Sequence, residues 1–580
     1  MTTLDFTAVS QKEYDFIIVG GEHLFKFTVA GTAGAVIASR LSENPDFKIL
    51  VLEAGGRGDG IVETIVPLLA SQAQGKPYNW PYVTESQAGL QGRTVSYPGG
   101  KVVGGSSMVN FMFTTRGSSE DWDRLAKATG DEGWAWESIL PLAKKIETWV
   151  PPTDGRDTTG DYDPEAHGDN GPVLISLPNS VSGLNKKLMQ AVQEVDGFSY
   201  NKDINAGSPL GVGWLPSTHG GGVRSSSNTY LKLAEGRANL DLVTGAQVTK
   251  LIFAPDSEDK EPAVVGVEFA SDAESPRFEV KASKEVILSA GSIGSPKILL
   301  LSGIGEKSAL ESLDIKVVKD LPDVGKNLRD HTMTFNQWTV DTKETRDEIS
   351  RDPEVGAAAQ QLFGTKQTAL AIGFFRIPET DPIWSKPGIQ DTSAGLNTPQ
   401  YELLLGDGYV GVLQPDPNVK NFFTVAAANL APSARGSVTL KSNDPFEAAL
   451  VDPNLLGEEI DVHIAIEAVK KARAYMTAPV YQAYNPIEWG PHATAHTDEE
   501  LEAYVRSNSI TVWHPTSTLA LSSKGSPDGV LDPDLKVKGV KGLRVADASV
   551  FPYSPAAHPQ IPVYIVGERA AEIIASQHRK

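Results

Sequence analysis

The 580-residue chain contains no cysteine. This absence excludes disulfide bonds, thiolate nucleophiles, iron–sulfur clusters and zinc sites with sulfur ligands. Long apolar runs are missing as well, and none reaches the length of a transmembrane helix. The sequence also has no His-Glu-x-x-His run or comparable cluster that would indicate a metal site. We therefore expect a globular protein that uses neither thiol nor metal chemistry.

Basic residues are fewer than acidic ones in this chain. The chain has 52 Lys and Arg residues against 73 Asp and Glu residues, which gives a net charge of −21. Binding to nucleic acid or to an anionic membrane requires a basic surface. We therefore expect neither partner and favour a neutral small-molecule substrate. Residues 1–7 lack a basic segment followed by an apolar one, so we expect an intracellular protein or a mature secreted one.

What the sequence does contain is a β-α-β pattern near its N-terminus. Residues 15–19 form a β-branched run, residues 33–42 have a helical pattern, and residues 48–54 form a second buried strand. Glycines occupy the turn before the helix, as in folds that seat a pyrophosphate there. Glu53 ends the second strand, where such folds place a carboxylate that binds an adenosine ribose. The pattern predicts an α/β, Rossmann-like nucleotide-binding domain.

The chain is too long for a single hydrophobic core, so we expect two discontinuous domains with the active site in the crevice between them. Four later segments have the pattern of buried strands and would extend the first domain: residues 240–248, 264–269, 285–289 and 543–547. The other parts are loop-rich or alternate polar strands with amphipathic helices. The predicted nucleotide-binding domain comprises residues 1–148, 225–323 and 510–580, and the predicted α+β substrate-binding domain comprises residues 149–224 and 324–509.

Two glycine-rich segments make this interpretation more specific. Residues 100–113 read Gly-Lys-Val-Val-Gly-Gly-Ser-Ser-Met-Val-Asn-Phe-Met-Phe, and residues 291–305 begin Gly-Ser-Ile-Gly-Ser-Pro. Either segment alone fits a structural glycine turn. Together, behind a β-α-β unit, they resemble the two signatures of the glucose-methanol-choline (GMC) family of FAD-dependent oxidoreductases. The resemblance runs from Tyr14 to about Ser576 and implies a substrate-binding domain built on an antiparallel sheet.

The resemblance also implies FAD as the cofactor and assigns its contacts. The glycine turn would surround the pyrophosphate, Glu53 would hold the ribose, and the backbone of Val248 would meet the adenine. The first signature would lie against the isoalloxazine and ribityl groups, and Asp547 with Ala548 would close over the ribitol. The implied contact residues are Gly20, Gly21, Gly31, Thr32, Ala33, Gly34, Glu53, Ala54, Val103, Ser106, Asn110, Phe111, Met112, Phe113, Val248, Asp547, Ala548, Pro559 and Gln560.

Two histidines lie in segments that match the family's catalytic motifs. Val512-Trp-His514-Pro matches the His-Pro motif, and residues 554–561 match the segment in which the family places His or Asn. Oxidation of an alcohol by hydride transfer to a flavin requires a base for the hydroxyl proton, and a neutral imidazole is suited to that task. We predict His514 as the base and His558 as the group that orients the alcohol. The remaining histidines, including His331, are interpreted as structural or surface groups.

The aromatic neighbours of this pair bear on the substrate. A His/His pair with Trp513 and Tyr97 nearby is most similar to the aryl-alcohol oxidase branch, so we predict oxidation of a small aromatic primary alcohol with oxygen or a quinone as electron acceptor. Trp513 also fits a core-packing role. Sugar-oxidising members carry His/His pairs too, and residues 516–521 depart from the common family pattern. A sugar or polyol substrate, and a lyase or cyclase on the same scaffold, stay open as alternatives.

Nine residues, Glu22 to Ala30, interrupt the glycine turn between Gly21 and Gly31. Phe25, Phe27 and Val29 alternate with other residues, a pattern typical of a half-buried strand. The segment has three interpretations. It is a hairpin that leaves FAD binding intact, or it displaces the helix dipole from the phosphates and abolishes FAD binding, or it does not belong to the natural protein.

The family resemblance predicts that the purified chain is yellow, because FAD binding is implied by segments throughout the sequence. Visible absorbance of the purified protein, before and after incubation with FAD, measures this directly. A colourless protein that cannot be reconstituted would contradict the oxidoreductase hypothesis. Deletion of residues 22–30 is the companion measurement, since recovery of colour and activity would identify the segment as the obstacle.

Overall fold

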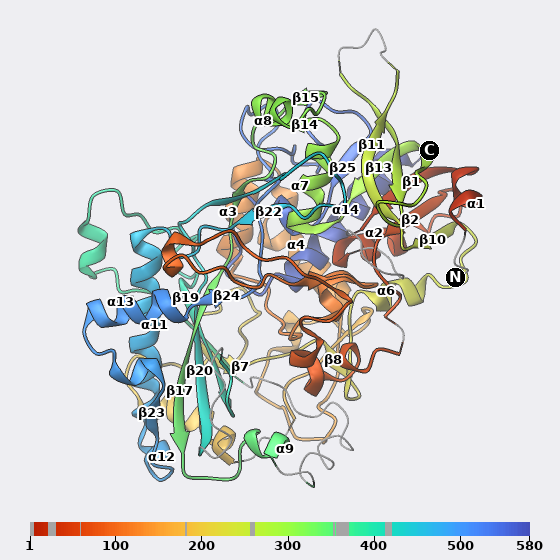
Figure 1. The fold of residues 1–580 in the computed structure, drawn as a ribbon. Coiled ribbons are helices and arrows are strands. Elements are labelled where there is room, and N and C mark those ends of the chain that lie inside the picture. Colours follow the sequence, from red (N-terminus) through yellow and green to blue (C-terminus); the bar gives the residue numbers. More distant parts are fainter. Residues whose placement is uncertain are drawn as a thin grey trace.

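The computed structural model describes residues 5–20, 31–58, 60–179, 183–255, 261–351, 354, 371–411 and 420–579. Gly21 and the interrupting residues 22–30 lie outside the described residues, so the hairpin predicted there stays a prediction. Two seven-stranded sheets organise the chain, and the helices pack around them (Figure 1). Among the described residues, no helix combines the length and the hydropathy that a membrane crossing requires.

The first sheet has the strand order β10-β2-β1-β13-β12-β11, and β25 pairs with β13 as a further strand. Neighbours from β10 to β13, and the β13–β25 pair, are parallel, whereas β11 and β12 are antiparallel. The β-branched runs of the central strands suit a sheet that is buried on both faces. The strands are β1 (Glu13–Val19), β2 (Ile49–Glu53), β10 (Leu240–Thr244), β11 (Gln247–Phe253), β12 (Val264–Ala270), β13 (Phe278–Leu288) and β25 (Leu543–Val545).

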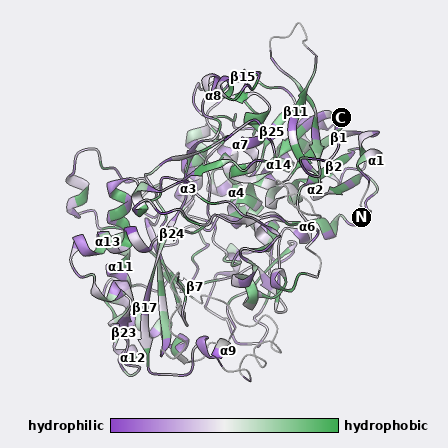
Figure 2. Cartoon of the chain, in the orientation of Figure 1, coloured by the Kyte–Doolittle hydropathy of each residue, from purple (hydrophilic) through white to green (hydrophobic). Residues whose placement is uncertain are grey.

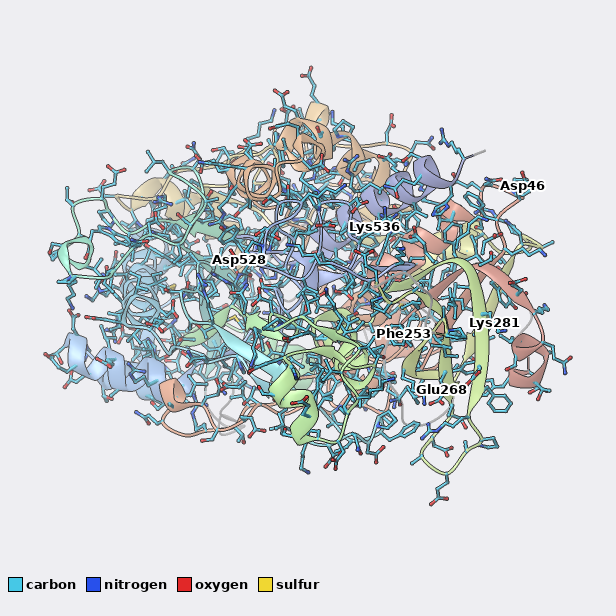
Figure 3. The ribbon with its side chains drawn as sticks, turned by 90° about the horizontal axis from the view of Figure 1, so that it is seen from above. Asp46, Phe253, Glu268, Lys281, Asp528 and Lys536 are labelled. Atoms are coloured by element: carbon cyan, nitrogen blue, oxygen red, sulfur yellow. The ribbon has the colours of Figure 1, made fainter. Side chains whose placement is uncertain are left out.

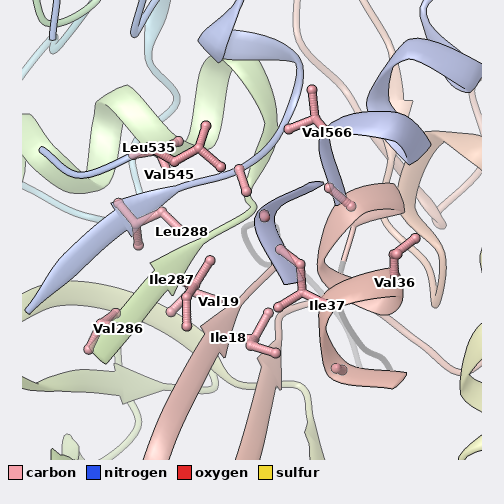
Figure 4. Close-up of a cluster of buried hydrophobic side chains, with 14 of the residues drawn as sticks. Ile18, Val19, Val36, Ile37, Val286, Ile287, Leu288, Leu535, Val545 and Val566 are labelled. Atoms are coloured by element: carbon pink, nitrogen blue, oxygen red, sulfur yellow. The ribbon is translucent and has the colours of Figure 1, made fainter. Parts of the chain in front are cut away.

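Helices α2 (Thr32–Leu41) and α14 (Gln560–His578) pack against each other beside this sheet, and α4 (Trp136–Ile146) and α6 (Asn228–Leu233) pack on them. Figure 4 shows part of this core, where Ile37 of α2 lies next to Ile18 of β1. The antiparallel edge is seen from above in Figure 3, with Phe253, Glu268 and Lys281 on β11, β12 and β13 respectively. The predicted β-α-β unit is confirmed.

The second sheet is entirely antiparallel, with the strand order β23-β17-β20-β19-β18-β7 and with β24 paired to β17. Helix α11 (Glu459–Met476) packs across β17, β19 and β20 and is one of the helices expected in the second domain. Surface helices such as α11 and α13 (Asp498–Asn508) mix hydrophobic and hydrophilic residues (Figure 2). The strands are β7 (Gly211–Trp214), β17 (Thr332–Val340), β18 (Ala371–Phe375), β19 (Tyr401–Asp407), β20 (Asn421–Asn429), β23 (Ile487–Trp489) and β24 (Ile510–Thr511).

Shorter elements connect the two sheets. They include a three-stranded sheet of β16 (Lys326–Leu328), β21 (Gly436–Thr439) and β22 (Leu450–Asp452), the pair β3 (Asn79–Trp80) and β4 (Gly99–Gly100), and helices α3 (Ser119–Thr129) and α7 (Gly291–Leu301). Strand β24 follows directly after the predicted boundary at residue 510 and pairs with the second sheet. The residue boundaries of the two domains stay a prediction.

One buried carboxylate joins the helices beside the first sheet. Glu568 of α14 is fully buried and accepts hydrogen bonds from Arg40 Nε of α2 at 2.9 Å and from the Tyr230 hydroxyl of α6 at 2.8 Å. Its other oxygen lies 2.8 Å from Lys145 Nζ of α4. Removal of a buried carboxylate leaves its cationic partners uncompensated, which destabilises the fold.

We therefore expect Glu568→Ala to destabilise the protein by about 3 kcal/mol. Glu572→Ala is the matched control, because Glu572 lies one turn further along α14 and its side chain is 46% exposed. Its Oε1 lies 3.5 Å from Lys145 Nζ, and exposed ion pairs of this kind contribute at most about 1 kcal/mol to stability. The thermal midpoints of both variants measure the difference. Equal midpoints would show that Glu568 does not join these helices energetically.

Candidate active site

One cavity lies where the carboxyl ends of the parallel strands approach the second sheet. Its walls come from the loop after β4, the start of α7, strands β17 and β19, the loop after β24 and the start of α14. Fifteen of the residues expected from the sequence lie along this cavity: Gly31, Thr32, Glu53, Ser106, Asn110, Phe111, Met112, Phe113, Trp513, His514, Asp547, Ala548, His558, Pro559 and Gln560. Segments that are hundreds of residues apart in the sequence therefore converge on one site.

The remaining expected residues lie behind the walls or elsewhere. Ala33, Gly34, Ala54, Val103 and Val248 are buried in the surrounding core, and Gly20 follows β1 with its N–H donating to the Leu52 carbonyl. Tyr97, expected to contact substrate, does not line the cavity, because its ring is buried and its hydroxyl donates to Asp330 Oδ2 at 2.6 Å. Gly21 lies outside the described residues.

The nucleotide end of the cavity is built from closely approaching backbones. A Cβ atom on Gly31 would lie 2.7 Å from the Ser289 carbonyl oxygen, and one on Gly105 would lie 3.0 Å from Gly31 Cα. The first signature and the start of α2 therefore touch where no larger residue fits. The first turn of α2 leaves backbone N–H groups unsatisfied at this point, which favours an anionic phosphate. With Glu53 at the end of β2, these features fit the dinucleotide expected from the sequence.

Arg224, which sequence reasoning missed, holds the first signature in place. It is buried, and its guanidinium donates to the Asn110 side chain at 2.7 Å, the Asn110 carbonyl at 2.8 Å and the Ser107 carbonyl at 3.2 Å. Burial lowers the pKa of Arg224 to about 9. The sequence held no signal for this role, because Arg224 lies more than a hundred residues beyond the loop that it holds.

A buried carboxylate fixes the loop that carries His514. Asp330 accepts hydrogen bonds from the Thr511 hydroxyl, from Tyr97 and, at 2.8 Å, from the His514 backbone N–H. Burial raises the pKa of Asp330 to about 6, although these three donors oppose the shift. These hydrogen bonds offset backbone strain in the loop. Trp513 has a φ of +60°, and this left-handed conformation raises the free energy of a bulky residue by about 1 kcal/mol or more.

The two predicted catalytic imidazoles face each other in the cavity. The ring centroids of His514 and His558 are 4.7 Å apart, with an angle of 80° between the planes. Nε2 of His558 lies 3.0 Å from Oε1 of Glu402, a fully buried carboxylate on β19. Burial, together with the nearby imidazoles of His558 and His331, lowers the pKa of His514 well below its ordinary value. His514 is therefore neutral near pH 7 and able to accept a proton.

Apolar side chains form the rest of the wall beside the histidines: Phe111, Phe113, Met333, Leu404, Val512 and Trp513. The indole of Trp513 stacks on Phe111 at 6.3 Å and donates its N–H to the Ser96 carbonyl. Two side-chain amides that also line the cavity bond to the protein. Asn110 donates to Gln560 at 2.8 Å, and Gln74 donates to the Val109 carbonyl. The part of the cavity next to the two imidazoles is thus chiefly apolar.

Comparison with known sequences decides the family. A model of the N-terminal region of GMC oxidoreductases matches residues 14–333, and a model of the C-terminal region matches residues 432–567. The chain belongs to the GMC oxidoreductase family. Pyranose dehydrogenase 3 from Leucoagaricus meleagris is 37% identical to it, over 98% of this chain and 94% of the relative. The resemblance read from the two signatures is confirmed.

Solved structures of GMC-type flavoproteins share the fold. An FAD-dependent oxidoreductase from Chaetomium thermophilum is 29% identical, with a TM-score of 0.86 over 98% of this chain and all of that chain. A fungal aryl-alcohol oxidase is 28% identical, with a TM-score of 0.80 over 97% of this chain and 99% of that chain. This GMC oxidoreductase therefore has the predicted fold and FAD as its cofactor, and the family acts on the CH–OH groups of alcohols or sugars.

The contacts of Arg224 predict a role in cofactor affinity. Each hydrogen bond from a charged group contributes about 1.5–3 kcal/mol, and 1.4 kcal/mol corresponds to about tenfold in affinity. We expect Arg224→Met to loosen the first signature and to weaken FAD binding by about 10–100-fold. Fluorescence titration of the apoprotein with FAD measures the change.

Arg237→Met is the control for this prediction. Arg237 also donates to backbone and hydroxyl oxygens, of Ser39 and Ser42, but it does so at the far end of α2 from the cavity. We expect this variant to lose stability and to retain its affinity for FAD. Equal losses of affinity in both variants would contradict a specific role for Arg224.

Proposed function

We propose that this GMC oxidoreductase oxidises a small, neutral primary alcohol with an aromatic substituent, and that His514 is the base. The observation that carries the proposal is the pair His514 and His558 on one face of the cavity, next to a wall of apolar side chains. Oxygen or a quinone would take up the electrons.

Residues on both sides of the cavity would hold FAD. The start of α2 and Gly105 would receive the pyrophosphate, Glu53 the ribose, and the loop fixed by Arg224 the flavin. When bound, FAD accepts the hydride that leaves the carbinol carbon. The buried Asp547 accepts hydrogen bonds from Ser295 and from the Gly291 N–H, which ties the second signature to the segment expected beside the ribitol.

His514 would accept the hydroxyl proton as the alcohol is oxidised. Its lowered pKa keeps the imidazole unprotonated near neutral pH, so the acceptor form is the resting form. The free-enzyme activity should fall only when the pH drops far enough to protonate this ring. Fixed geometry adds to the effect, because Asp330 holds the His514 backbone N–H.

His558 would orient the alcohol oxygen. Glu402 lies within hydrogen-bond distance of its Nε2, and the His558 backbone N–H donates to the Thr115 hydroxyl at 2.7 Å. These two contacts hold the ring and the backbone of His558 in one position. An alcohol that bonds to both imidazoles would present its carbinol carbon in a defined direction.

The apolar wall favours an aromatic substituent over a sugar. A sugar carries several hydroxyls, and each hydroxyl buried without a partner costs about 1–3 kcal/mol. Phe111, Phe113, Met333 and Leu404 offer no such partners, and the nearby amides of Asn110 and Gln74 already donate to protein oxygens. A sugar substrate is the second candidate, because the 37% identical relative is a pyranose dehydrogenase.

Anaerobic reduction of the flavin by a panel of alcohols tests the proposal. We expect benzylic alcohols to bleach the flavin absorbance with a kcat/KM about 100-fold or more above that of glucose, because each unpaired sugar hydroxyl weakens binding. His514→Ala should slow bleaching by about 10²–10⁴-fold, the usual contribution of a general base, while FAD stays bound.

His463→Ala is the control histidine variant. His463 lies on α11, its Nε2 is 3.1 Å from Oδ1 of Asp381, and it does not line the cavity. It should reduce the flavin at the rate of the unmodified protein. Faster bleaching by glucose than by benzylic alcohols would favour the sugar dehydrogenase. Turnover of an alcohol without any bleaching would favour a lyase, and undiminished bleaching by His514→Ala would reject His514 as the base.

A further inference from the structure

His331 lies directly behind the proposed base. It immediately precedes β17, is fully buried and does not line the cavity. Its Nδ1 is 3.1 Å from Nδ1 of His514, and the two rings meet edge to face at 84°. Its other ring nitrogen, Nε2, is 2.9 Å from the Ser554 hydroxyl, four residues before His558. His331 therefore bridges the two segments that carry the catalytic pair.

A hydrogen bond between two imidazole nitrogens needs one proton on one of them, so only two neutral arrangements exist. In the first, His514 Nδ1–H donates to His331 Nδ1, and His331 Nε2–H donates to the Ser554 oxygen. In the second, His331 Nδ1–H donates to His514 Nδ1, and the Ser554 hydroxyl donates to His331 Nε2. The two arrangements leave opposite groups on Nε2 of His514.

Only the first arrangement produces a base. Because His331 occupies Nδ1 of His514, Nε2 is the nitrogen left for an alcohol in the cavity. In the first arrangement Nε2 carries a lone pair and accepts the hydroxyl proton. In the second it carries a proton and can only donate. The tautomer of a catalytic histidine is set by the bond that its other nitrogen makes.

We propose that His331 is a positioning residue that holds His514 in the Nδ1–H tautomer, with the lone pair of Nε2 directed to the alcohol. This inference rests on the proposed function, since it matters only if His514 is the base. Carboxylates commonly hold a catalytic histidine in this way. Here the two nearby carboxylates bond elsewhere, Asp330 to the loop backbone and Glu402 to His558, so a neutral imidazole sets the tautomer without a further buried charge.

Two variants of His331 distinguish an effect on the tautomer of His514 from an effect on packing. In His331→Asn the amide oxygen can take the place of Nδ1 and accept the proton from His514. In His331→Leu no acceptor remains. We expect kcat for the alcohol to fall by about 10²-fold or more in the Leu variant, within the range for loss of a working base. KM should change less than about threefold, because uniform binding is kept, and the Asn variant should recover most of the rate.

Nitrogen-15 NMR of histidine-labelled holoenzyme reads the tautomer without relying on turnover. The His514 signals are identified by their loss in His514→Ala. We expect a protonated Nδ1 and an unprotonated Nε2 in the unmodified enzyme and in His331→Asn, and a changed pattern in His331→Leu. An unprotonated Nδ1 in the unmodified enzyme, or an unchanged spectrum and kcat in His331→Leu, would overturn the proposal.

Two further variants keep the test decisive. His492→Leu removes an equally buried histidine that contacts the Trp489 carbonyl and does not line the cavity; it should alter stability but neither kcat nor the His514 signals.

If His331→Leu does not fold, Ser554→Ala replaces it. Loss of the acceptor for His331 Nε2–H should then lower kcat at least about fivefold, and an unchanged kcat and spectrum would reject the proposal. Undiminished flavin reduction by His514→Ala would instead overturn the proposed function itself.

Discussion

The loop that carries His514 depends on the carboxylate of Asp330. This group is buried and yet receives donors from three separate segments: the ring hydroxyl of Tyr97, the hydroxyl of Thr511 and the backbone N–H of His514. A buried carboxylate is stable only when such donors surround it, so each of these segments is tied to one point. The next residue, His331, then contacts the His514 ring. The dipeptide directly before β17 thus fixes both the backbone and the side chain of the proposed base.

The two imidazoles proposed for catalysis have different hydrogen-bond partners. Nε2 of His558 lies within hydrogen-bond distance of a carboxylate, that of Glu402. Nδ1 of His514 lies within hydrogen-bond distance of another imidazole, that of His331. The carboxylate places an acidic group next to His558, whereas a neutral ring places none next to His514. The two histidines therefore occupy distinct electrostatic surroundings although they share one cavity. Such asymmetry suits a site in which one ring accepts a proton and the other donates a hydrogen bond.

Local patterns predicted much of the fold. The β-branched runs marked β1, β2 and the later strands of the first sheet. The first signature marked a loop, and the second marked the start of α7, and both line the cavity. Groups brought in by tertiary packing escaped prediction. Glu402 reaches His558 only because of the register of the second sheet, and Arg224 reaches the first signature across more than a hundred residues. The sequence predicts only a structural role for His331, since nothing local in it shows that this residue faces His514.

The glycine contacts at the start of α2 bear on the length of the segment before it. The Gly20 N–H donates to the Leu52 carbonyl, and Gly31 packs closely against Ser289 and Gly105. The residues on both sides of residues 21–30 are therefore fixed by contacts with the rest of the domain. The close approach of Ser289 and Gly105 thereby helps to position the start of α2. A connection between Gly20 and Gly31 therefore has to meet two attached ends, which is the closure condition that a loop of any length must satisfy.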